Sequence, residues 1–69
     1  MIKVYGKSGC SRCQELKGIL EGKKKEFQYI EDMGELSRVA MKAKIAMAPV
    51  VEYDGELYTM EEFLKKAGL

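Results

Sequence analysis

Two cysteines separated by two residues constrain this chain most, because they stand where a strand pattern gives way to a helical one. Residues 1–5 alternate so that Ile2 and Val4 share one face, which is typical of a short strand. A turn follows, and the run Cys10-Ser11-Arg12-Cys13 comes directly after it. Over residues 11–22 apolar side chains recur at helical spacing. The cysteine pair is therefore expected at the first turn of a helix that follows a strand.

The rest of the chain continues in short alternating elements. We expect, in order, a strand over 26–30, a helix over 34–46 capped by Asp32, strands over 50–53 and 56–58 joined by an Asp54-Gly55 turn, and a last helix opened by a capping box at Thr59 and Glu62. Strands joined through a helix run parallel, and a hairpin runs antiparallel. The order βαβαββα thus predicts an α/β fold, with a four-stranded mixed sheet and helices on both faces.

Length and charge narrow the function classes. The 69 residues predict a single domain over 1–69, and the net charge of +1 gives no basic footprint for nucleic acid. The one basic run, residues 23–25, is expected to be a solvated helix end. No run of 18 apolar residues is present, and residues 1–5 do not resemble a signal peptide. We therefore expect a cytoplasmic monomer that binds neither membranes nor nucleic acid.

The absence of histidine removes most nucleophilic and metal chemistry. Without it, a histidine general base, a Cys-His pair and a Cys/His zinc site within one chain are all excluded. We expect no bound metal and no tightly bound cofactor. The remaining candidate catalytic groups are Cys10 and Cys13.

Cys10 is expected to be the reactive sulfur. At the start of a helix, its sulfur faces backbone N–H groups that have no partner within the helix, and the helix dipole favours a thiolate there. Lys7 and Arg12 should add positive potential nearby. The sequence therefore predicts a lowered pKa for the Cys10 thiol and an appreciable thiolate population near neutral pH.

Cys13 is expected to be the resolving sulfur. It lies three residues on, on the same helical face as Leu16 and Leu20, so it should be the more buried of the two and close enough to bond to Cys10. In this division of labour Cys10 attacks a disulfide and Cys13 resolves the mixed disulfide. A structural disulfide staple and a pair of inert buried cysteines are the alternatives, but a loop this short constrains the unfolded state little.

Other residues carry weaker expectations. Four methionines, residues 33, 41, 47 and 60, are expected to fill the core, with Met47 as the exception because it precedes Pro49. Gly18, inside the first helix, could serve close packing on the sheet. Pro49, the only proline, fits either a trans helix break or a cis bond that turns the next strand toward the cysteines.

These features resemble the glutaredoxin/thioredoxin superfamily over essentially the whole chain, and most of all the small glutaredoxin-like proteins and the redoxins that reduce ribonucleotide reductase. The resemblance is carried by the run from Gly6 to Cys13, by Ala48-Pro49-Val50 and by the Asp54-Gly55 hairpin before a final helix. It implies a minimal, glutaredoxin-like form of the thioredoxin fold and a dithiol disulfide reductase.

The resemblance also implies roles for single residues. Cys10 and Cys13 would be the nucleophile and the resolving thiol, Pro49 a cis-proline, and Ala48 a backbone partner for a substrate peptide or glutathione. Lys7 would pair with a glutathione carboxylate, and we add Arg12 and Met47 as substrate-binding candidates. The implied partners are a disulfide-containing protein and an electron donor, either glutathione as co-substrate or a thioredoxin-reductase-like enzyme. The family's usual Pro-Tyr or Gly-Pro between the cysteines is replaced here by Ser-Arg.

Other functions remain open from the sequence. Small copper-trafficking domains also place a C-x-x-C between a first strand and a first helix, so Cu(I) binding is the main alternative. Their order, however, is βαββαβ, and they usually carry Met two residues before the first cysteine, where Ser8 stands here. Zinc or an iron–sulfur cluster would need two chains to share a site. A non-catalytic interaction domain is a further alternative.

Overall fold

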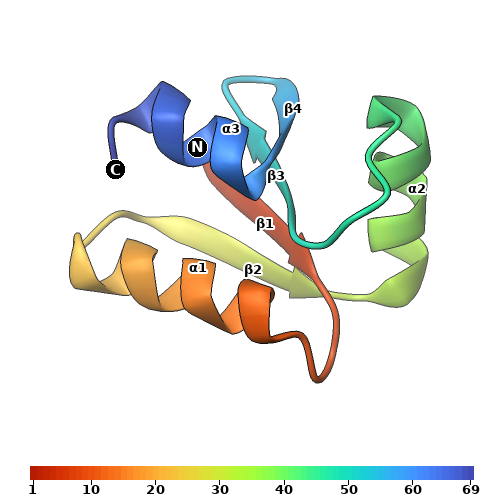
Figure 1. The fold of residues 1–69 in the computed structure, drawn as a ribbon, viewed down its shortest axis with the longest axis horizontal. Helices are drawn as coiled ribbons and strands as arrows, with labels where there is room; N and C mark the ends of the chain where they lie inside the picture. Colours follow the sequence, from red (N-terminus) through yellow and green to blue (C-terminus); the bar gives the residue numbers. More distant parts are fainter.

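A computed structural model describes all of residues 1–69, and its centre is a four-stranded sheet in the order β2-β1-β3-β4 (Figure 1). The elements, in chain order, are β1 (Ile2–Gly6), α1 (Ser11–Gly22), β2 (Phe27–Glu31), α2 (Met33–Ala43), β3 (Val50–Tyr53), β4 (Glu56–Thr59) and α3 (Met60–Ala67). β1 pairs in parallel with β2 and antiparallel with β3, and β3 pairs antiparallel with β4. The mixed sheet and the order βαβαββα are confirmed.

The three helices divide between the two faces of the sheet (Figure 1). Side chains alternate along β1, so that Val4 points toward α1 and α3 while Tyr5 points toward α2. The larger core lies on the first face and contains Ile2, Val4, Leu16, Leu20, Val51, Met60 and Phe63. The smaller core, beneath α2, contains Tyr5, Leu36, Val39 and Val50.

Three local signals, two helix caps and one turn, act where the sequence predicts them. The Asp32 side chain accepts a hydrogen bond from the backbone N–H of Glu35 at 3.0 Å and so caps α2. The capping box that opens α3 is complete, because Thr59 and Glu62 each accept from the other's backbone N–H. Asp54 and Gly55 both adopt positive φ, as a tight hairpin turn requires.

Several predicted boundaries were wrong by a few residues. α2 ends at Ala43 rather than at residue 46, because Lys44 adopts the left-handed conformation and its N–H turns back onto the carbonyls of the last helical turn. The first two strands each begin and end one residue later than expected, at Ile2–Gly6 and Phe27–Glu31. These shifts leave the topology unchanged.

Two expectations about packing were also wrong. Met33 and Met41 are 64% and 80% exposed, and only Met60 of the expected fillers is buried in the core. α2 covers the sheet with a narrow stripe, and these two methionines lie beside that stripe. Gly18 does not serve close packing, since a Cβ there would meet no atom within 4 Å.

None of the helices has the length and the apolar character that crossing a membrane requires.

Candidate functional site

Cys10 is the N-cap residue of helix α1. Gly9 adopts a φ of +72°, which L side chains rarely tolerate, and this turn delivers Cys10 to the N-cap position. The Sγ of Cys10 accepts a hydrogen bond from the backbone N–H of Cys13 at 3.1 Å. The expectation that this sulfur faces the free amides of the helix is confirmed. A sulfur that accepts a backbone N–H at the positive end of a helix dipole is favoured in its anionic form.

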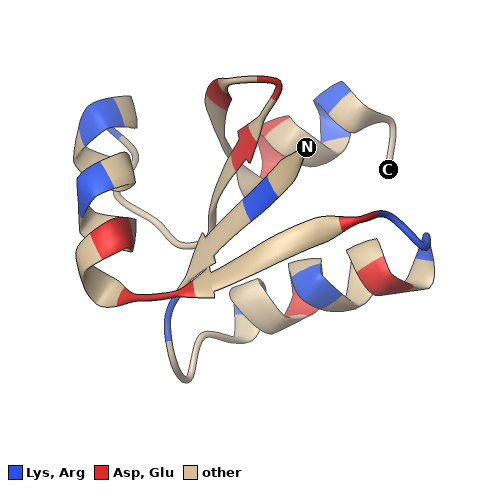
Figure 2. Ribbon diagram, turned by 180° about the vertical axis from the view of Figure 1, so that it is seen from behind, with Lys and Arg blue, Asp and Glu red and all other residues tan.

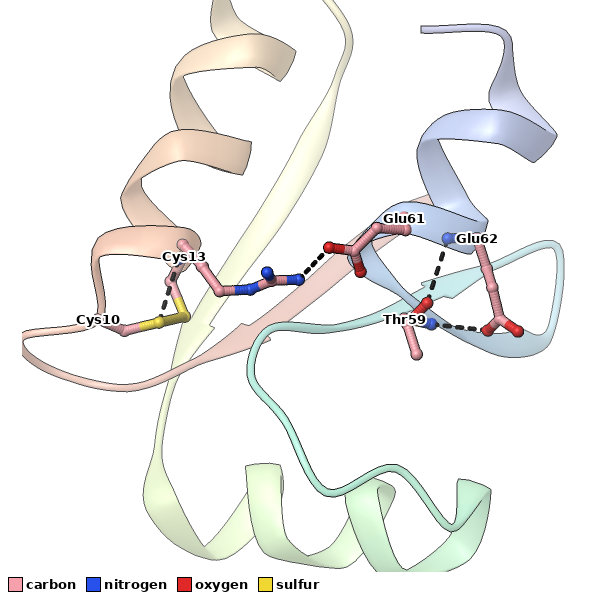
Figure 3. A network of polar contacts seen from close by, with 6 residues as sticks. Cys10, Cys13, Thr59, Glu61 and Glu62 are labelled. Atoms are coloured by element: carbon pink, nitrogen blue, oxygen red, sulfur yellow. Dashed lines mark hydrogen bonds and ion pairs between the residues drawn. A yellow bond between two sulfur atoms is a disulfide. The ribbon is translucent and has the colours of Figure 1, made fainter.

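The two cysteines form a disulfide, with their Cα atoms 5.2 Å apart (Figure 3). Cys13 is fully buried, as predicted. Cys10 retains only 9% of its surface and is less exposed than the sequence suggested, because its side chain folds over the first turn of α1. Of the two cysteines, only Cys10 therefore keeps any exposed surface.

Gly6, at the end of β1, lies close to the side chain of Cys13. A Cβ built on Gly6 would lie 3.0 Å from Cys13 Sγ and 2.7 Å from the hydroxyl oxygen of Tyr29, so glycine leaves room for both groups. Tyr5 pairs with Val50 across the β1–β3 ladder, and this register brings the buried Pro49 beside Gly6. The Ala48–Pro49 peptide is cis, as the resemblance implied.

Arg12 extends away from the disulfide to α3. Its guanidinium donates to the carboxylate of Glu61, 49 residues further along the chain (Figure 3). The hydrogen bond from Arg12 holds the pKa of Glu61 below its usual value, helped by a backbone N–H at the start of α3. The pair links α1 to α3, and the positive potential expected from Arg12 at the sulfur stays a prediction.

Lys7 lies on the opposite side of the cysteines, at the edge of an apolar hollow of about 480 Å³. The hollow brings Lys7 together with Met47 and Ala48, so three of the predicted binding residues share one surface. Eight of its eleven lining residues are hydrophobic; they are Met33, Leu36, Ala40, Met41, Ile45, Ala46, Met47 and Ala48. We call this surface the methionine hollow, since Met33, Met41 and Met47 are all more than half exposed there.

The charge around the hollow is basic. Lys7 and Lys44 both line it, and no acidic residue does. The basic residues of α2, Arg38 and Lys42, line a second hollow together with Glu52 and Glu56 of the β3–β4 hairpin. Figure 2 shows acidic residues along that hairpin and residues of both charge signs on α2. An apolar ligand with acidic flanks would match the hollow and its edges.

Sequence reasoning missed two groups of residues at this site. Glu61 and Tyr29 come close to the cysteine-bearing segment only through tertiary structure, so no local pattern marks them. Met33 and Met41 do carry a signal, since with Ser37, Ala40 and Lys44 they follow a helical stripe next to the buried one. Reading α2 as two adjacent stripes would have found the hollow.

The structure holds no group of three or more Cys, His, Asp or Glu side chains that could bind a metal ion. No protein-family model matches the sequence, and no curated protein matches it.

Proposed function

We propose that this protein is a thiol–disulfide oxidoreductase that reduces disulfides in other proteins. The observation that carries the proposal is the asymmetry of the cysteine pair. Cys10 sits at a helix N-terminus, where its sulfur accepts a backbone N–H, and Cys13 is fully buried behind it at bonding distance. Cys10 lies at the start of the helix and keeps some exposed surface, and Cys13 is shielded and adjacent.

The reaction runs in two exchanges. In the reduced protein the Cys10 thiolate attacks one sulfur of the substrate disulfide, and the electron pair of the broken S–S bond leaves on the other substrate sulfur, which takes up a proton. The Cys13 thiol then loses its proton and attacks Cys10 Sγ. The substrate's second sulfur leaves with the electron pair, and the Cys10–Cys13 disulfide forms. Two electrons pass to the substrate, and a thiol donor must restore them.

The arrangement of the chain supports this proposal over Cu(I) binding. The order βαβαββα ends in helix α3, whereas the copper-trafficking domains with a similar C-x-x-C end in a strand. The resemblance to glutaredoxins and thioredoxins supports a thioredoxin-like fold and the reductase activity. Glutathione or a thioredoxin-reductase-like enzyme would supply the electrons, in a cytoplasmic setting.

The methionine hollow favours a protein as the substrate. Its lining includes Lys7, three residues before Cys10, and Ala48, next to the cis-proline Pro49, and it extends over the exposed side of α2. Methionine is flexible and polarizable, and it suits surfaces that accept varied apolar side chains. We propose that an apolar segment of the substrate protein, flanked by acidic residues, lies in the hollow with its disulfide over Cys10. Lys7 and Lys44 would pair with the acidic flanks.

Reduction of insulin disulfides by the reduced protein, with dithiothreitol as donor, tests the function. Cys10→Ser should abolish turnover. Cys13→Ser should still attack once and accumulate a mixed disulfide through Cys10, which mass spectrometry of the adduct would detect. The proposal fails if Cys10→Ser keeps reductase activity, or if Cys13→Ser traps substrate on no cysteine.

A further inference from the structure

The hydroxyl group of Tyr29 is buried without a partner. Tyr29 lies on β2 and packs against the larger core, and its hydroxyl oxygen has almost no accessible surface and no hydrogen bond. Buried hydroxyl groups in folded proteins nearly always have a partner, and an unpaired one costs stability. An exception beside a reactive centre calls for an explanation.

The sulfur of Cys13 and this hydroxyl group both approach one point above Gly6, at the end of β1. Both atoms lie within about 3 Å of the point where a side chain on Gly6 would begin, at 2.7 Å for the Tyr29 oxygen and 3.0 Å for Cys13 Sγ. Glycine at position 6 therefore leaves space in which the two groups face each other. In the disulfide form no hydrogen bond joins them.

We propose that Tyr29 is a positioning residue for the resolving sulfur: when the disulfide opens, its hydroxyl group donates a hydrogen bond to Cys13 Sγ and stabilises the thiolate. The inference rests on the proposed function for its place in the catalytic cycle. A thiolate is a far stronger acceptor than a disulfide sulfur, so the unpaired hydroxyl group gains its partner only in the reduced protein and in the mixed disulfide.

The proton stays on Tyr29 throughout. Burial, and secondarily the nearby charge of Glu31, raise the pKa of the Tyr29 hydroxyl above its usual value, so it remains a donor at neutral pH. The Cys13 thiol loses its proton to solvent, its electron pair forms the bond to Cys10 Sγ, and the substrate sulfur leaves with the electrons of the broken bond. Tyr29 contributes the hydrogen bond and no proton.

Other ionisable groups around the pair are few. Lys17 of α1 lies over the Tyr29 ring, with its Nζ 5.4 Å from the ring centroid, and Glu31 lies on the same strand as Tyr29. On the α3 side, Arg12 is paired with Glu61. Tyr29→Phe leaves Lys17 and Glu31 in place, so a change in the pKa of Cys13 would report the loss of the hydroxyl group.

Tyr29→Phe tests the proposal, because it removes only the hydroxyl oxygen. In a Cys10→Ser background, the variant should raise the pKa of Cys13, followed by the ultraviolet absorbance of the thiolate. With both cysteines present, and at a pH high enough to ionise Cys13, it should shift the dithiol–disulfide equilibrium toward the disulfide by roughly tenfold, the effect of losing one charge-assisted hydrogen bond. The thermal stability of the disulfide form should not fall, because an unpaired buried hydroxyl group has been removed.

Tyr5→Phe is the matched control. The Tyr5 hydroxyl group donates to Glu52 at 3.4 Å on the opposite face of the sheet, so its loss should affect both redox forms alike and leave Cys13 unchanged. Circular dichroism checks that both variants fold. An unchanged Cys13 pKa together with an unchanged redox equilibrium in Tyr29→Phe would overturn the inference. Neither readout needs a substrate, so this failure is distinct from retained activity in Cys10→Ser, which would overturn the function.

Discussion

The two faces of the sheet are built differently. α1 and α3 together cover one face, where the core has seven buried residues, including Leu16, Leu20 and Phe63, which have no exposed surface. α2 alone covers the other face, where the core has four buried residues and three methionines beside it are more than half exposed. The first face holds Cys13 in place, and the second offers an apolar surface to a partner. One small domain thus separates its stabilising core from its proposed binding surface.

The largest effect on the free energy of unfolding should come from truncating one buried side chain in each core. Phe63→Ala removes a fully buried ring and should cost about 3–5 kcal/mol, close to the whole stability of roughly 3–10 kcal/mol expected for this length. Leu36→Ala, in the thinner core, should cost about 2 kcal/mol. Urea unfolding of the disulfide forms measures both. Equal losses would contradict the difference between the faces.

A smaller effect should separate two glycines on the first face. Gly6→Ala forces a Cβ against Tyr29 and Cys13 and should destabilise the protein by about 1–3 kcal/mol. Gly18→Ala adds a Cβ into open space on α1 and should stabilise it by about 0.5–1 kcal/mol. Thermal unfolding distinguishes the signs. If both substitutions shift the thermal unfolding midpoint in the same direction, Gly6 is not closely packed against Cys13.

The second face should respond in binding rather than in stability. Met41→Gln replaces a side chain that is 80% exposed, so unfolding should change by less than about 0.5 kcal/mol. The KM for a protein disulfide should rise, by roughly tenfold if the side chain is fully covered by the substrate. Turnover of a small disulfide, which cannot fill the hollow, serves as the control. An equal loss with both substrates would argue against docking in the methionine hollow.

The smallest effect should be the pH dependence of the link between α1 and α3. Because Arg12 lowers the folded-state pKa of Glu61 below its value of 4.5 in the unfolded chain, the pair stabilises the protein above that pH. Its contribution is lost as the pH falls through the lowered pKa. The exposed position makes the effect modest.

Glu61→Gln should therefore reduce the drop in unfolding temperature between neutral pH and acid. Glu35→Gln, which breaks the exposed pair with Arg38 on α2, controls for the loss of one surface carboxylate. If Glu61→Gln loses stability in acid as steeply as the unmodified protein, the pair contributes no measurable link between the two helices.

Much of this fold follows from local sequence signals. The capping box at Thr59, the cap at Asp32 and the Asp54-Gly55 turn each act within a few residues, so they could be predicted directly. The end of α2 could not, because Lys44 adopts a left-handed conformation that its side chain does not favour. The sequence carries no marker for such a conformation.

The candidate site divides in the same way. The placement of Cys10 and Cys13 follows from their spacing and from the helix start, and both were predicted. The partner of Arg12 lies 49 residues away, and the position of Tyr29 beside Cys13 depends on how β2 pairs with β1. Contacts set by strand register and helix packing need the assembled structure.

The ionisation of Cys10 tests the account most directly. In the reduced protein, alkylation by iodoacetamide should be followed against pH, with mass spectrometry assigning the modified residue. The account predicts that Cys10 reacts first and titrates well below the value of about 8.5 for a free cysteine, while Cys13 stays protected. A Cys10 that titrates like a free thiol, or a Cys13 that is modified first, would contradict it.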